Sequence, residues 1–258
     1  MAIATWILLR GLTRGRHHWA GFDRALEAAM PASRVLALDL PGNGELFEMQ
    51  SPTCVADMVL NVRNQLQQCG AVGPVGVLAV SMGGMVATQW AQTWPKELAL
   101  LVLVNTSMRP YSNPLQRLLA KNYLHLLSLP FASEKPVDQE RTILKMTSNH
   151  AQLDVLDHWA QLRKSQPVSS MNALRQLWAS ARFRAHSSAP QMPTLILGSH
   201  GDSLVSPLCS MQLAKAWGVE LRMHPSAGHD LTLDAGDWVL AEVQRACGAL
   251  SQVQGSVR

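Results

Sequence analysis

Unbroken apolar runs alternate along the first half of the chain with segments in which apolar residues recur at helical spacing. The runs are typical of strands buried on both faces of a parallel sheet, and they fall at residues 5–9, 34–39, 75–80 and 98–104. The helical spacing predicts helices at residues 19–30, 53–69 and 82–94, with Thr53 as an N-cap and Gly70 as a C-terminal stop. Strands and helices in this order predict a parallel sheet with right-handed crossovers.

The alternation stops after the fourth strand. Residues 114–185 contain no convincing strand, and their spacing predicts helices at 115–129, 137–146, 153–162 and 169–183. A strand (193–198), a helix (207–217), an edge strand (219–224), a helix (238–250) and a loose tail (251–258) are expected to follow. We therefore predict an α/β fold with a mostly parallel sheet flanked by helices. Residues 1–107 and 187–258 would form the core, and an all-helical cap, residues 108–186, would be inserted after the strand that ends near Val104.

A serine stands between the third strand and the helix that follows it. In Ala79-Val80-Ser81-Met82-Gly83, small residues on either side let strand and helix approach closely and let Ser81 adopt a strained backbone. This is the form of a nucleophile elbow, with alanine at a position where glycine is commoner. A plain turn of another α/β protein fits the same five residues.

Two polar residues after later strands supply the serine with chemical partners. His229 follows the last strand, and Asp202 follows the strand before it. A serine needs a base that takes its proton, and the base needs an acid that orients it. Because the carboxyl ends of parallel strands meet at one edge of a sheet, these residues should cluster with Gly11 and Asn105.

These segments resemble the α/β-hydrolase superfamily, and within it the capped bacterial carboxylesterases, including those that cleave pimeloyl-carrier-protein methyl esters. The chain order Ser, Asp, His is the one found in that superfamily. Asp39-Leu-Pro-Gly-Asn-Gly44 resembles its D-x-P-G-x-G loop, and Gly201-Asp202 and Gly228-His229 resemble its acid and histidine loops. The likeness covers nearly the whole chain, and the helical insertion matches the superfamily's cap.

The resemblance implies an oxyanion hole formed by the backbone N–H groups of Leu12 and Met82. Two positions depart from the pattern: Arg10-Gly11 stands where His-Gly is usual, and Asn43 stands where His or Phe is common. Since the hole needs backbone donors, its main element can survive the first change. The sequence leaves open whether Arg10 replaces the structural role of the histidine or faces the pocket.

The function we expect is that of a serine hydrolase that cleaves a carboxylic ester or thioester, with Ser81, His229 and Asp202 as the catalytic residues and no cofactor or metal. Two alternatives stay open: a non-catalytic binding protein of the same fold, and a triad enzyme of another reaction (perhydrolysis, C–C hydrolysis or acyl transfer). The candidate substrate contacts are Arg10 and five residues of the predicted cap: Tyr123, Leu127, Met146, Trp159 and Trp178. Each of the five cap residues fits a place in the interior of the cap equally well.

Composition restricts the other function classes. With 47% hydrophobic residues among 258, the chain can bury a substantial core, and no apolar run approaches a membrane span. Neither a phosphate-binding loop nor a dinucleotide fingerprint occurs. The N-terminal residues read as a first strand rather than a signal peptide, and the scattered cysteines read as reduced thiols, so we expect a cytoplasmic location.

Positive charge is concentrated in the predicted cap. Residues 107–186 hold eleven Lys/Arg and five Asp/Glu (+6), whereas the rest holds eleven and thirteen (−2). These charges fit solvated helix faces, and they also fit a surface that attracts an anionic substrate or an acidic carrier protein. Nucleic-acid binding is disfavoured because aromatic residues are not interleaved with the basic ones. The residues concerned are Arg117, Lys121, Arg141, Lys145, Arg163, Lys164 and Arg175.

Several polar residues near these motifs have simpler interpretations. Asp39 precedes the Pro-Gly loop and is expected to be structural. The His17-His18 pair, next to Arg14, lacks acidic partners and is expected to lie on the surface. We expect Asp230 to be solvated or to cap a helix, and Asp234 and Asp237 to begin one.

Overall fold

The computed structural model describes residues 3–122, 135–150 and 153–255. Its centre is a sheet of six parallel strands in the order β2-β1-β3-β4-β5-β6. The α/β class and the parallel sheet predicted from the sequence are confirmed. The strands are β1 (Thr5–Leu9), β2 (Arg34–Leu38), β3 (Val75–Val80), β4 (Leu98–Val104), β5 (Thr194–Ser199) and β6 (Glu220–His224).

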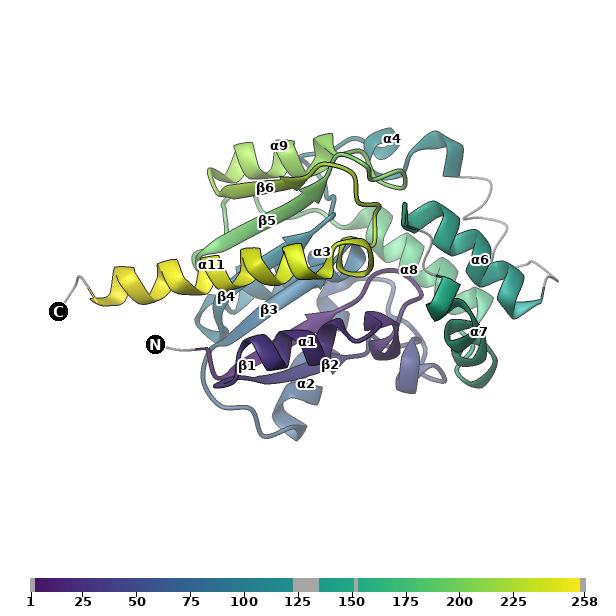
Figure 1. The fold of residues 1–258 in the computed structure, drawn as a ribbon, viewed down its shortest axis with the longest axis horizontal. Coiled ribbons are helices and arrows are strands. Elements are labelled where there is room, and N and C mark those ends of the chain that lie inside the picture. The colour runs from purple at the N-terminus through teal and green to yellow at the C-terminus, as the bar shows by residue number, and fades with distance from the viewer. Residues whose placement is uncertain (1–2, 123–134, 151–152, 256–258) are drawn as a thin grey trace.

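Helices cover both faces of the sheet (Figure 1). On one face lie α1 (Phe22–Ala29) and α11 (Gly236–Gly255), and on the other lie α2 (Val55–Gln68), α3 (Met82–Thr93) and α9 (Leu208–Trp217). Successive side chains of a strand point to opposite faces. In β1, Trp6 and Leu8 therefore pack with the first pair of helices, while Ile7 and Leu9 pack with the other three. All four side chains are fully buried.

The described chain between β4 and β5 consists of helices joined by loops, and its only β-structure is an isolated bridge. Its elements are α4 (Pro114–Arg117), η4 (Ala120–Asn122), α6 (Pro136–Thr147), η6 (Leu153–Val155), α7 (Leu156–Ser165) and α8 (Ser170–Arg182). The main ones, α6, α7 and α8, lie together beyond one end of the sheet (Figure 1). An isolated bridge joins Arg109 to Arg184, so this segment leaves and re-enters the core at one place. We call it the cap; its boundaries at residues 108 and 186 stay a prediction.

Several element boundaries differ from those expected. The predicted helix at 115–129 is wrong in its described part, because α4 ends at Arg117 and Leu118 is extended (φ −144°, ψ 120°); residues 123–129 lie outside the described residues. The N-cap of α2 is Cys54 rather than Thr53, whereas Gly70 follows the helix with φ +65° as predicted. The tail expected at 251–258 is helical as far as Gly255.

Candidate active site

Ser81 occupies a strained turn between β3 and α3. Its backbone angles are φ 55° and ψ −119°, a region that residues with a side chain rarely adopt and that costs about 1–3 kcal/mol. Neighbouring groups hold the turn: the Ser81 N–H donates to the carbonyl of Val104 (2.9 Å), and the hydroxyl of Thr106 donates to the Ser81 carbonyl (2.7 Å). The serine therefore has the backbone conformation of the predicted elbow.

The small residues of the elbow are required by close packing against the loop after β1. A Cβ added to Gly83 would lie 2.6 Å from the carbonyl oxygen of Leu9 and 2.7 Å from that of Arg10. From the other side, a Cβ on Gly11 would lie 3.0 Å from Cβ of Ser81. The loop that carries Leu12 therefore rests directly on the serine turn, and Leu12 and Met82 line the same cavity as Ser81.

The predicted base and acid are in contact. Nδ1 of His229 lies 2.8 Å from Oδ2 of Asp202, and both side chains are buried. The other carboxylate oxygen of Asp202 accepts the backbone N–H groups of Leu204 and Val205, each at 2.9 Å. Asp202 is thus fixed by its own loop, with one oxygen available to orient the imidazole.

Asn105 connects the loops that carry the acid and the base. It follows β4 with φ 43°, and its amide group donates to the carbonyls of His229 (2.9 Å) and Gly228 (3.2 Å). Its amide oxygen accepts the N–H of Ser199 (3.0 Å) at the end of β5. The clustering expected for Asn105 is confirmed, and its role as a brace between two loops could not be predicted from its position alone.

Arg10 reaches across the molecule to the residue after His229. Its Nη1 and Nη2 atoms lie 3.0 and 2.5 Å from the two carboxylate oxygens of Asp230, and both side chains are buried. Burial alone would raise the pKa of Asp230, but the Arg10 charge and the hydrogen bonds from Arg10 and Thr232 outweigh it, and the pKa lies below its ordinary value. Asp230 holds the N-cap position of α10 (Leu231–Asp234), one of its two expected roles, but its side chain makes no cap hydrogen bond. The expectation that it is solvated is wrong, because its carboxylate is buried in this ion pair.

The same loop is also attached to the cap. Nη1 of Arg14 lies 2.6 Å from Oε2 of Glu140 in α6, and the Thr13 N–H donates to Gln176 in α8 (2.9 Å). Gln176 in turn donates to Asn43 (2.8 Å), which donates to the Arg14 carbonyl (3.1 Å). Ion pairs at Arg10 and Arg14 thus anchor both ends of the loop, which explains how it keeps its place without the usual histidine.

A cavity of about 420 Å³ brings the elbow, the histidine and the cap together. Ser81 and His229 line it from the core, together with the loop at Arg10–Arg14. Cap residues complete the wall, and most of them are apolar: Pro114, Arg117, Leu118, Ile143, Met146, Thr147, Leu177, Ser180 and Ala181. The cavity volume is in the range of small-molecule sites.

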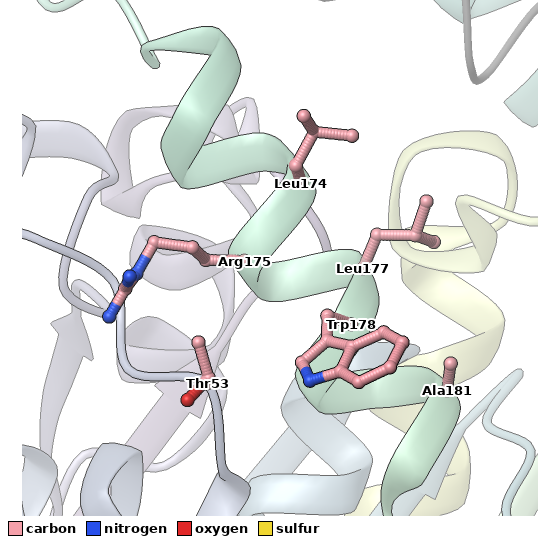
Figure 2. A pocket seen from close by; sticks show the side chains of 6 residues that line it. All are labelled: Thr53, Leu174, Arg175, Leu177, Trp178 and Ala181. Atoms are coloured by element: carbon pink, nitrogen blue, oxygen red, sulfur yellow. The ribbon is translucent and has the colours of Figure 1, made fainter.

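Two of the aromatic candidates for substrate contact lie elsewhere. Trp159 is fully buried in the cap, with the Arg14 guanidinium 4.8 Å from its ring centroid. Trp178 is 55% exposed and lines a second pocket with Thr53, Leu174 and Arg175 (Figure 2). Helix α8 buries its polar Asn172 and Gln176 against the core loops, which turns Trp178 outward.

The other candidates divide between the cavity and the undescribed part of the chain. Met146 lines the cavity as expected, and Arg10 lines it while paired to Asp230. Tyr123 and Leu127 lie outside the described residues.

Other polar residues near the site also differ from expectation. Asp234 ends α10 (Leu231–Asp234) rather than beginning a helix, and it accepts the N–H of Gly228 (2.6 Å), the N–H of Asn149 (2.8 Å) and the hydroxyl of Ser148 (2.5 Å). His18 is half-buried against Trp159 instead of lying on the surface, and burial, with Arg14 and Arg10 nearby, lowers its pKa well below the ordinary value. Asp39, by contrast, is structural as expected, because its carboxylate accepts the N–H groups of Arg16 and Glu45.

Part of the basic charge of the cap is neutralised within the cap. Arg163 pairs with Glu140 and Arg141 with Asp138. Arg175 donates to the carbonyl of Ser51, and Arg117 donates to the carbonyl of Ser180 (2.5 Å). These four arginines are therefore engaged in contacts within the chain rather than simply solvated on helix faces. An acidic carrier protein as a partner stays a prediction without support.

The described residues contain no cluster of three or more metal-ligating side chains, and none of their helices is long and apolar enough to cross a membrane. The four cysteines are free thiols. The cytoplasmic location expected from the sequence stays a prediction.

Comparison with known proteins defines the class. The profile of the alpha/beta hydrolase family matches residues 6–242, so the chain belongs to this family. Its fold and site combine a parallel sheet, a strained serine turn and a buried His–Asp pair.

Particular relatives carry out different reactions. A 2-hydroxy-6-oxononadienedioate/2-hydroxy-6-oxononatrienedioate hydrolase of Pseudomonas putida is 31% identical over 101 residues, which is 39% of this chain and 35% of that protein. A thermophilic esterase from Thermogutta terrifontis is 20% identical with a TM-score of 0.74, covering 96% of this chain and 90% of that one. The enol-lactonase from Burkholderia xenovorans is 16% identical with a TM-score of 0.76, covering 95% and 91%. The two structures share the fold, and the curated relative is matched over about a third of its length.

Proposed function

We propose that the protein is a serine hydrolase that cleaves a carboxylic ester or thioester of a small molecule through an acyl-enzyme. The observation that carries the proposal is the 2.8 Å contact between His229 and Asp202, in a cavity that Ser81 also lines from a strained elbow. A serine that shares a cavity with a buried His–Asp pair has the partners that activate a hydroxyl for attack. Family membership and esterase neighbours of the same fold agree with it.

In the proposed reaction Ser81 attacks the carbonyl carbon of the ester. The Asp202 carboxylate holds the Nδ1–H of His229, which leaves Nε2 to take the serine proton and then to deliver it to the leaving group. The backbone N–H groups of Leu12 and Met82 would hold the developing oxyanion, and loss of one such donor costs about 3–4 kcal/mol of transition-state stabilisation. Water then attacks the acyl-enzyme with His229 as the base.

Two variants test this assignment. Ser81→Ala should abolish both hydrolysis of p-nitrophenyl esters and labelling by a fluorophosphonate, because each requires the serine oxygen. Thr106→Val, which removes a hydrogen bond to the Ser81 carbonyl but no reacting group, should retain labelling at a reduced rate. A Ser81→Ala protein that hydrolyses esters like the wild type would overturn the proposal. A wild-type protein inert to both reagents would favour the non-catalytic binding protein.

Hydrolysis of a carbon–carbon bond is a second candidate. The observation that favours it is the Pseudomonas putida relative, whose substrate is a 2-hydroxy-6-oxo dicarboxylate. The same nucleophile and base would act, but the leaving group would be a carbon that has to be protonated. Incubation with 2-hydroxy-6-oxononadienedioate, followed by product analysis, separates the two reactions: turnover of this compound without ester turnover would favour the second.

A further inference from the structure

Charged side chains beside the cavity are unequal in number. Arg10 takes both carboxylate oxygens of Asp230, whereas Arg14 and Arg163 share one carboxylate, that of Glu140, at 2.6 Å each. Three guanidinium groups thus face two carboxylates in these ion pairs. Asp230 and Glu140 are almost completely buried. A buried charge without a full complement of partners is unfavourable, so this cluster would be stabilised by one more anion.

Arg10 has an unpaired Nε but binds Asp230 through both of its terminal nitrogens, whereas Arg14 has a terminal nitrogen without a partner in the described part of the chain. The Arg14 side chain is only 8% exposed, and its Nη2 atom has no hydrogen-bond partner among the residues that the structure describes. The ring of Trp159 lies 4.8 Å from the guanidinium, and Glu140 accepts from Nη1 only. Burial, followed by the charge of Arg163, outweighs Glu140 and lowers the pKa of Arg14, as expected for a cation that is incompletely balanced.

Arg14 also lines the cavity that contains Ser81 and His229. Asp230, already held by Arg10, is the one carboxylate among the residues that line this cavity in the described chain. Guanidinium is the side-chain group best suited to bind carboxylates, since it offers parallel N–H donors in a fixed fork. The remaining wall is mostly apolar. It provides few other hydrogen-bond donors, so an anion in the cavity would depend on Arg14.

We propose that Arg14 forms an anion subsite, which binds a carboxylate that the substrate carries at a distance from the bond attacked by Ser81. The substrate class would then be half-esters of dicarboxylic acids or related carboxylate-bearing esters. In such a reaction water supplies a hydroxyl to the acyl carbon and a proton to the alcohol, and the new carboxylic acid releases its proton to solvent, so that the products are a dicarboxylate, a neutral alcohol and a proton. This inference rests on the proposed esterase function, and it specifies further that the substrate is negatively charged.

A pair of matched esters tests the subsite. Mono-p-nitrophenyl glutarate carries the carboxylate, and p-nitrophenyl methyl glutarate has the same acyl chain with the charge removed. The wild type should show a kcat/KM at least tenfold higher for the acid. Arg14→Gln should lose this preference, and Arg14→Lys, which keeps the charge but not the fork, should retain part of it. Arg141→Gln is the matched control, because Arg141 pairs with Asp138 on the helix that carries Glu140, belongs to neither of the buried ion pairs and does not line the cavity; it should keep the preference.

A binding measurement makes the test independent of turnover and of the folding of the Arg14 variants. Ser81→Ala protein should bind monomethyl glutarate and not dimethyl glutarate in calorimetry. Equal kcat/KM values for the two esters, or equal binding of the two ligands, would overturn the anion subsite while ester hydrolysis still supported the proposed function. Absence of both hydrolysis and fluorophosphonate labelling, with selective binding of the acid, would overturn the proposed function and leave the subsite standing.

Discussion

Two arginines four residues apart on one loop form buried ion pairs of different kinds. Arg10 meets Asp230 one to one, with two short contacts between loops of the core. Arg14 reaches the cap and shares Glu140 with Arg163. The first pair is balanced and fastens the loop of the proposed oxyanion hole to the loop of His229. The second is unbalanced, so it connects core to cap while it keeps positive charge beside the cavity. The balance of the first pair indicates a structural role for Arg10, and the imbalance of the second is the basis of the anion subsite proposed for Arg14.

Breaking the balanced pair should have the largest effect on stability. Arg10→Met leaves the buried carboxylate of Asp230 without its cation and should lower the free energy of unfolding by about 3–5 kcal/mol. The double variant Arg10→Met/Asp230→Leu should recover most of this loss, because no buried charge then remains. Urea unfolding at neutral pH measures both. If the double variant were as unstable as the single one, the ion pair would not be the cause.

Breaking the shared pair should cost less and should act on the cap. Glu140→Gln removes the carboxylate from Arg14 and Arg163, but Arg163 is 20% exposed and can turn toward water. We expect a loss of about 2 kcal/mol, seen by hydrogen exchange as weaker protection of α6 with the strands unchanged. Asp138→Asn is the matched control on the same helix. It breaks an exposed pair with Arg141 and should cost less than about 1 kcal/mol. Equal loss of protection in α6 and in the strands would contradict the separation of cap and core.

Acidification should have the smallest effect on the free energy of unfolding. It should also distinguish the contribution of the Arg10–Asp230 pair from that of the other titrating groups. The pKa of Asp230 is below its ordinary value in the folded protein. Its stabilising contribution is therefore complete above the unfolded pKa of about 4 and is lost as the pH falls through the folded pKa. Unfolding free energies at pH 7 and pH 3 should differ more in the wild type than in Arg10→Met/Asp230→Leu. An identical pH dependence in the two proteins would show that Asp230 is not linked to stability in this range.

The positions of the residues that directly follow strands could be predicted from the sequence. Unbroken apolar runs define the strands, and parallel strands bring Ser81, Asp202 and Asn105 to one edge whatever the details of the helices. The partner of Arg10 was not predictable, because Asp230 lies 220 residues away in the chain and nothing in either neighbourhood specifies the other.

The cap was harder to predict because polar side chains hold it to the core. Helix α8 buries Asn172 and Gln176, so its apolar spacing indicates the wrong face as the inner one. For α6 the sequence did contain a pattern that predicts the ion pair of Glu140. Glu140 lies three residues after Val137 and three before Ile143, on the apolar stripe of the helix. An acidic residue at such a position indicates a buried partner of opposite charge.

The bridge between Arg109 and Arg184 has a consequence for protein engineering. The backbone N–H of Ala185 also donates to the carbonyl of Arg109 (2.8 Å), so the two chain crossings between core and cap lie side by side. A foreign helical segment could be spliced in between these two points without changing the strand register or the serine turn. Such a chimera would have to supply new partners for Thr13 and Arg14, the two anchors that the native cap provides through Gln176 and Glu140. Exchange of the cap is thus a route to a different cavity wall that leaves Ser81, Asp202 and His229, the residues of the proposed reaction, in place.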